Sequence, residues 1–236
     1  MKFWDSLKSG LLAGVLAGVV RSLFSLVFTT PLLDRAIELD ESIPGARPEM
    51  FTRGMQKFGM VVGFLLYGVM MGLLFGAVYA LLKEKLPVKG GRGKGILLAF
   101  LAYWSMVLLP FLKYPANPPG VGGEENIAFR QATYAGIIAI SVLLTVVSVW
   151  WFTYLARVKN WRWLIAISSC VIVAAAAYFL MPPHPLPPTT LPASLLWSFR
   201  AVSLAGLTLF WFALGINFVL LGKRLSKKKA TGKLAD

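Results

Sequence analysis

Six long apolar runs narrow the folds that this chain can adopt. They have roughly the 17–25 residues with which a helix crosses the hydrocarbon core of a bilayer. The runs lie near residues 10–33, 59–82, 95–112, 134–155, 164–181 and 194–221. A hydrophobic content of 57% and a mean hydropathy of +0.70 are typical of integral membrane proteins. We therefore expect an all-α, polytopic membrane protein, a six-transmembrane-helix bundle in a single membrane domain over residues 1–236.

The net charge of +14 follows membrane topology. If both termini lie on one side, that side holds 16 of the 24 Lys and Arg residues, the other side holds six, and two lie within spans. The acidic residues lean the other way, with seven of ten on the second side. The positive-inside rule then predicts cytoplasmic N and C termini. Basic segments placed in this way meet membrane lipids, so no nucleic-acid partner is expected.

Glycines recur every four residues in the first two runs, at Gly10, Gly14, Gly18, Gly68, Gly72 and Gly76. This spacing leaves one helix face almost free of side chains, so another helix can approach closely. We expect the packing to occur within one chain. An interface with a second copy, and hence a homo-oligomer, is the alternative.

Few residues are candidates for contact with an ion. Arg21 lies in the first run, where a charge must face protein or water, so it either hydrogen-bonds at the bundle centre or borders an ion path. Asp34, Glu38 and Glu41 are spaced to share one helix face that would attract cations, although a solvated surface is the preferred interpretation. His184, the single histidine, lies in a proline-rich loop and is a weak candidate for a metal contact.

The segment 111–123 lies near the midpoint of the chain between two apolar runs. Its sequence, FLKYPANPPGVGG, contains three prolines and three glycines. Proline removes backbone donors and fixes φ, while glycine permits turns closed to other residues, so neither helix nor strand is expected. These constraints indicate one specific conformation rather than a slack linker.

A resemblance becomes specific at this segment. The string FLKYPANPPGVG, followed by an acidic pair and Arg130, resembles the signature of the CbtA family of predicted cobalt transporter subunits. LPASLLWSFR at 191–200 with SLAG at 203–206, and GFLLYG at 63–68, are similar to that family as well, so the likeness covers most of the chain. The chain departs from the pattern at Ser198, where many relatives carry arginine, which leaves Arg200 as the only arginine of this block.

The resemblance implies the membrane subunit of a cobalt (divalent metal ion) uptake transporter in the plasma membrane of a prokaryote. Relatives look paired with a small, single-span, histidine-bearing subunit, which would supply metal ligands that this chain lacks. Cobalt would be the transported substrate, and we expect no stably bound cofactor. The expected gate or ion-path residues are Tyr114, Asn117, Pro118, Pro119, Gly120, Arg130, Arg21, Trp197 and Arg200.

Enzyme activity is not expected. The chain has no acidic residue in any apolar run, no serine–histidine–acid arrangement, no H-E-x-x-H motif and no Walker motif. One other class stays open, a non-transporting scaffold or assembly subunit of another membrane complex. Co-purification with such a complex, without a metal-dependent phenotype on deletion, would distinguish it from a transporter.

Overall fold

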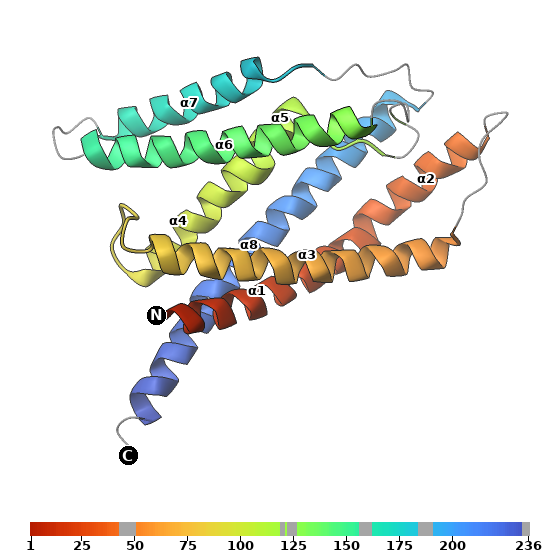
Figure 1. Ribbon diagram of the computed structural model, residues 1–236. Coiled ribbons are helices and arrows are strands. Elements are labelled where there is room, and N and C mark those ends of the chain that lie inside the picture. Colours follow the sequence, from red (N-terminus) through yellow and green to blue (C-terminus); the bar gives the residue numbers. More distant parts are fainter. Residues whose placement is uncertain (43–50, 119–120, 122–126, 156–161, 184–190, 233–236) are drawn as a thin grey trace. The chain divides into compact units, whose positions relative to one another are not determined.

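The computed structural model describes residues 1–42, 51–118, 121, 127–155, 162–183 and 191–232. Every regular element in these residues is helical (Figure 1), which confirms the all-α prediction. Two of the elements, labelled η, are π-helical turns. The elements are α1 (Phe3–Phe24), η1 (Ser25–Thr29), α2 (Thr30–Glu41), α3 (Arg53–Leu82), α4 (Gly91–Tyr103), η2 (Trp104–Leu108), α5 (Leu109–Lys113), α6 (Ile127–Leu155), α7 (Arg162–Leu180) and α8 (Ala193–Gly232).

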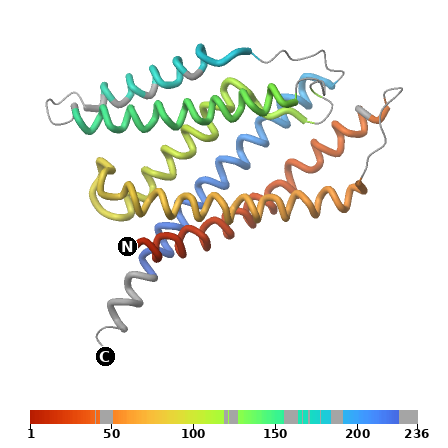
Figure 2. The backbone as a smooth tube through the Cα atoms, viewed as in Figure 1, coloured from red at the N-terminus to blue at the C-terminus, as the bar shows by residue number. Residues whose placement is uncertain are grey.

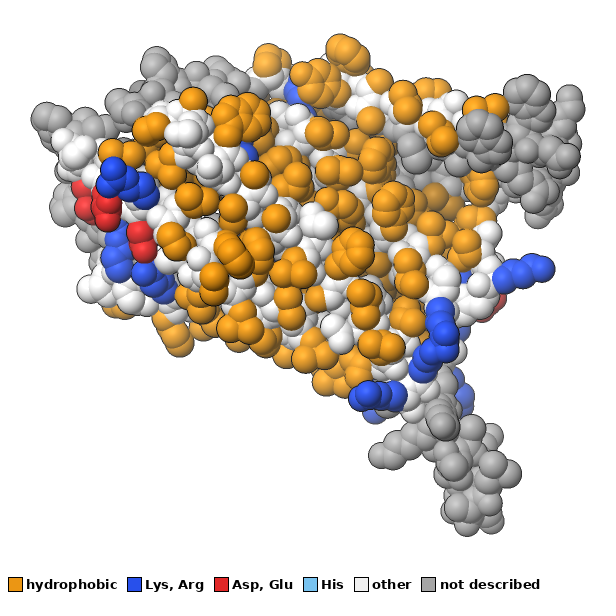
Figure 3. Space-filling view, turned by 180° about the vertical axis from the view of Figure 1, so that it is seen from behind, with side chains coloured by type: hydrophobic (Ala, Val, Ile, Leu, Met, Phe, Trp, Pro, Cys, Tyr) orange, Lys and Arg blue, Asp and Glu red, His pale blue; other side chains and the backbone are white. Residues whose placement is uncertain are grey.

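Five helical stretches are long and apolar enough to cross a membrane. They are Phe3–Leu39, Arg53–Leu82, Gly91–Lys113, Ile127–Tyr154 and Ala193–Arg224. A sixth apolar helix within α7, Ile167–Leu180, is shorter. Large hydrophobic side chains are widely exposed (Figure 3), as expected of helices that face lipid. The polytopic helical architecture is therefore confirmed, whereas the cytoplasmic termini and the limits of each span stay predictions.

The chain forms two compact units. Unit 1 comprises Met1–Arg35, Ile43–Phe100 and Ala205–Asp236, and unit 2 comprises Ala36–Ser42 and Leu101–Leu204. Helix α8 therefore contributes residues to both units. The prediction of a single membrane domain is not tested by this division and stays a prediction.

In unit 1, α1 and α3 lie against each other through their glycines (Figure 2). A Cβ atom added at Gly14 would collide with the carbonyl oxygen of Gly68, and one at Gly72 would lie 2.8 Å from the Cα atom of Gly14. Because backbone atoms cannot yield cheaply, only glycine permits this approach. The prediction that the glycine faces pack within one chain is confirmed at this contact. A homo-oligomer through other surfaces stays a prediction.

Two π-helical turns interrupt the apolar helices. Turn η1 follows α1 directly, and the Thr30 hydroxyl donates to the Ser25 carbonyl oxygen at 3.0 Å. Turn η2 lies between α4 and α5, and the Ser105 hydroxyl donates to the Leu101 carbonyl oxygen at 2.9 Å. Such turns are rare and frequently occur at functional sites. Both turns are therefore candidate functional positions.

In unit 2, α6 and α7 run side by side (Figure 2), and α5 contacts both helices. Tyr114, directly after α5, packs with Ile137 of α6. A second cluster of buried residues joins Ala36, Val121 and Leu191. The two clusters hold both ends of the segment 114–121 in place. The prediction that the segment 111–123 contains no helix is wrong at its start, because α5 extends to Lys113 and ends only two residues before Pro115.

Candidate functional site

The segment 114–121, which we call the anchored loop, begins at a buried tyrosine. Tyr114 is only 6% exposed, and its hydroxyl donates a hydrogen bond to the Pro182 carbonyl oxygen at 2.5 Å. Burial raises the pKa of this hydroxyl above its ordinary value of 10.0, and a hydrogen bond with Thr133 partly offsets the rise. The hydroxyl therefore remains protonated at neutral pH, and Tyr114 ties the loop to the segment that follows α7.

The middle of the anchored loop is held by a buried arginine of α8. Arg200 is 7% exposed, and its Nη2 and Nε atoms donate to Asn117 Oδ1 at 2.8 Å and 3.3 Å. The guanidinium carbon lies 5.0 Å from the centre of the Trp197 ring, within cation–π range. Two charge-assisted hydrogen bonds therefore converge on one amide oxygen. Asn117 is thus bound to α8 in this state.

The far end of the anchored loop is fixed by α6 and by hydrophobic contacts. Arg130 Nη1 donates to the Val121 carbonyl oxygen at 3.3 Å, and the Val121 backbone N–H donates to the Pro118 carbonyl oxygen at 3.4 Å. The Pro118 side chain is buried. Two other predicted site residues, Pro119 and Gly120, lie outside the described residues.

Five of the predicted gate residues therefore come together in unit 2, namely Tyr114, Asn117, Arg130, Trp197 and Arg200, and Pro118 lies among them. They come from the anchored loop, α6 and α8. Hydrogen bonds from Arg130 and Arg200 couple the loop to these two helices. These residues hold the loop through hydrogen bonds from cationic guanidinium groups, which are not metal ligands.

The predicted acidic metal candidates have other contacts. Asp34 Oδ2 forms an ion pair with Lys57 Nζ at 3.0 Å in unit 1. Glu38 and Glu41, on α2, also have interaction partners. Within the part of the chain that the structure describes, no group of three or more His, Cys, Asp and Glu side chains is placed to hold a metal ion. His184 lies outside the described residues.

Arg21, the remaining predicted ion-path residue, lies in unit 1 and is only 6% exposed. Its guanidinium carbon lies 4.7 Å from the ring centre of Phe64 and 5.9 Å from that of Phe24. The Nη1 atom lies so close to Gly206 of α8 that a Cβ atom added there would collide with it. Among the described residues, Nε and Nη1 have no hydrogen-bond partner. Two aromatic rings thus contact the charge, but within the described part of the chain two of its donors have no acceptor.

Two hydroxyl groups on η1 share this property. Ser25 Oγ and Thr29 Oγ1 are buried and have no hydrogen-bond partner among the described residues. Both lie within the π-helical turn that follows Arg21. The sequence interpretation identified Arg21 but missed these hydroxyls and Gly206. The two hydroxyl residues lie four and eight positions after Arg21, and this helical spacing could have indicated that they share its helix face.

Comparison with known proteins gives the family. A family model described as "Probable cobalt transporter subunit (CbtA)" matches residues 4–222. Searches of curated proteins and of solved structures found no match. The matched range contains the anchored loop, Arg21 and Arg200. A transporter subunit belongs to no enzyme class, is embedded in a membrane and implies a partner subunit. The chain is therefore a multi-pass membrane protein that belongs to the CbtA family of probable cobalt transporter subunits.

Proposed function

We propose that this chain is the membrane subunit of a cobalt uptake transporter and that it acts with a small, single-span, histidine-bearing partner. Family membership supports the transport of cobalt. The chain contains one histidine and one cysteine, and its apolar runs contain no Asp or Glu. Cobalt is bound best by several converging imidazole, thiolate or carboxylate ligands. The partner supplies those ligands, and cobalt passes as substrate without stable binding to this chain.

The observation that carries the proposal for this chain's own part is the pair of hydrogen bonds from Arg200 to Asn117. They join α8 to the anchored loop, which the charge distribution predicts to lie on the extracytoplasmic side. In this state the arginine covers the amide oxygen and its charge opposes a bare cation. When α8 shifts, Asn117 Oδ1 becomes free to contact a partly hydrated ion. A single amide oxygen is a weak ligand for cobalt, which suits a contact that must release the ion.

Uptake of labelled cobalt tests this gate. Cells that lack other cobalt uptake would express the chain with its partner, as wild type, Asn117→Ala, Arg200→Gln or the double variant. We expect each single change to alter uptake at low cobalt. The double variant should resemble the more affected single variant, because both residues act through one contact.

Asn217→Ala is a matched control, since Asn217 also belongs to α8 but donates to the Ala213 carbonyl oxygen of its own helix at 2.8 Å. It should leave uptake near the wild-type rate. Unchanged uptake in Asn117→Ala and Arg200→Gln would remove the gate while leaving transport intact. Deletion without any effect on cobalt uptake, together with co-purification of another membrane complex, would replace transport by a scaffold role.

A further inference from the structure

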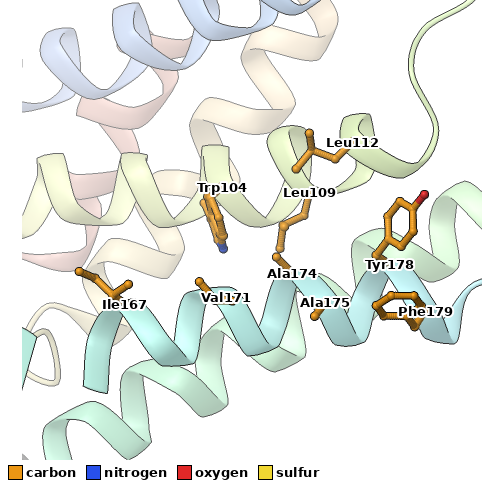
Figure 4. Close-up of a pocket in the computed structure, with 9 residues that line it drawn as sticks. All are labelled: Trp104, Leu109, Leu112, Ile167, Val171, Ala174, Ala175, Tyr178 and Phe179. Carbon is orange, nitrogen blue, oxygen red and sulfur yellow. The ribbon is translucent and has the colours of Figure 1, made fainter. Parts of the chain in front are cut away.

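Unit 2 contains an apolar groove between the η2–α5 stretch and α7. Its volume is about 570 Å³, within the range of roughly 300–1,000 Å³ that holds small molecules in proteins. Trp104, Leu109 and Leu112 form one wall, and residues of α7 that include Val171, Ala174 and Tyr178 form the other. Figure 4 shows Trp104 and Leu109 pointing toward α7 across the gap. The groove is thus built from two helices of the same unit.

The groove is open, and its walls are hydrocarbon and aromatic. On α7, Val171 is 60% exposed and Phe179 is 81% exposed. Ala174 and Ala175 have small side chains, which leave space in the groove between the larger side chains of α7 (Figure 4). An exposed apolar surface on a helix of a membrane protein meets either acyl chains or another helix. The chemistry of the walls therefore selects an apolar occupant.

The length of the groove favours an acyl chain over a transmembrane helix. On α7 its lining extends from Ile167 to Phe179, which corresponds to roughly 18 Å at the rise of an α-helix. The hydrocarbon core of a bilayer is about 30 Å thick, so the groove covers little more than one leaflet. A spanning helix has about 20 residues, so part of it would lie beyond the groove. A single acyl chain matches the groove from end to end.

One end of the groove carries a positive charge. Tyr178 lines the groove, and Lys113 Nζ lies 4.3 Å from the centre of its ring. Lys113 is also the last residue of the third spanning stretch, Gly91–Lys113. A lysine at this position reaches the depth of lipid head groups, where it attracts anionic phosphate. The groove with Lys113 at its end is therefore complementary to a phospholipid, which has an apolar chain and an anionic head group.

We propose that the groove binds one anionic phospholipid, with an acyl chain between α5 and α7 and the head group at Lys113. The site does not involve the anchored loop's bond to Arg200, so it stands or fails independently of the proposed gate. The bound chain fills the space beside α7.

Native mass spectrometry of the purified full-length chain tests the site, with dioleoyl phosphatidylglycerol and dioleoyl phosphatidylcholine as probes. Wild type should retain phosphatidylglycerol. Ala174→Trp fills the groove and should lose this adduct, whereas Ala139→Trp, at an exposed alanine of α6, should keep it. Lys113→Gln should weaken retention of phosphatidylglycerol about fivefold and that of phosphatidylcholine much less, as expected for one lysine near a head group.

Equal retention of phosphatidylglycerol by wild type, Ala174→Trp and Lys113→Gln would overturn the proposal. The glutamine variant keeps the helices' packing surfaces, so this comparison holds even where the tryptophan variant does not fold. A photo-crosslinking amino acid at position 175 in intact membranes gives a second readout. A lipid adduct supports the site, whereas a protein adduct would show that a partner helix or a second copy occupies the groove instead.

Discussion

Arg21 and Arg200 are the same residue in similar settings, yet their surroundings differ in kind. Both lie in apolar helices, both are less than a tenth exposed, and both have aromatic rings within cation–π range. Arg200 donates twice to Asn117, whereas Nε and Nη1 of Arg21 have no partner in the described part of the chain. A buried charge is retained cheaply only where its donors are satisfied. Arg200 therefore serves as an anchor, and Arg21 is the costlier residue to keep.

The largest expected effect is at the anchor. Arg200→Ala removes both hydrogen bonds and frees the anchored loop, so we expect a loss of roughly 2–3 kcal/mol in stability, as for hydrogen bonds to charged groups. Thermal unfolding in detergent measures the loss, and proteolysis between Tyr114 and Pro118 should accelerate. Arg200→Lys keeps the charge but not the planar pair of donors, so its stability should lie between that of wild type and that of Arg200→Ala. An alanine variant as stable and as protease-resistant as wild type would contradict the anchor.

At Arg21, packing is tested through its neighbour on α8. Gly206→Ala places a Cβ against the guanidinium group and should cost about 1–2 kcal/mol, in the range of overpacked cores. In an Arg21→Met background the cost should fall, since the collision is removed, and a double-mutant cycle on unfolding measures this coupling. Equal costs in both backgrounds would mean that Arg21 does not fill this space.

Removal of the Arg21 charge should change the stability in the opposite direction to removal of Arg200. Arg21→Met replaces unsatisfied donors by an apolar side chain of similar length, and we expect stability to stay equal or to rise by about 1 kcal/mol. Cobalt uptake measured on the same variant separates the effect of Arg21 on stability from a role in transport. Reduced uptake with unchanged or higher stability would assign Arg21 to function. A marked loss of stability would break the contrast between the two arginines.

The smallest effect concerns the tyrosine that begins the anchored loop. Tyr114→Phe removes the hydrogen bond to Pro182 and should cost about 1 kcal/mol at neutral pH. Because burial raises the pKa of Tyr114 above 10.0, this contribution is present below that pH and is lost as the pH rises through the raised pKa. The difference in stability between wild type and Tyr114→Phe should therefore shrink above pH 10. A difference that stays constant there would show that the hydroxyl does not titrate in the folded loop.

Local patterns of the sequence were sufficient for much of this fold. Hydropathy predicted six apolar helices, and the four-residue glycine spacing predicted that the first two of them have a face that another helix can approach closely. The prolines predicted the irregular path of the anchored loop. Each of these depends on residues close together in the chain, where helix period and backbone constraints act directly. The candidate gate residues were also selected from the sequence, but only as separate residues.

The partners of those residues depended on contacts across the chain. Asn117 and Arg200 are 83 positions apart, and Tyr114 and Pro182 are 68 apart. The π-helical turn after Arg21 is not visible in a hydropathy pattern, because one extra residue per turn barely changes the apolar content.

The sequence by itself determined that the chain is helical, embedded in a membrane and related to cobalt transporter subunits. Only the tertiary structure decided which buried arginine has its donors satisfied, because that depends on which acceptor another helix or loop brings within hydrogen-bond distance.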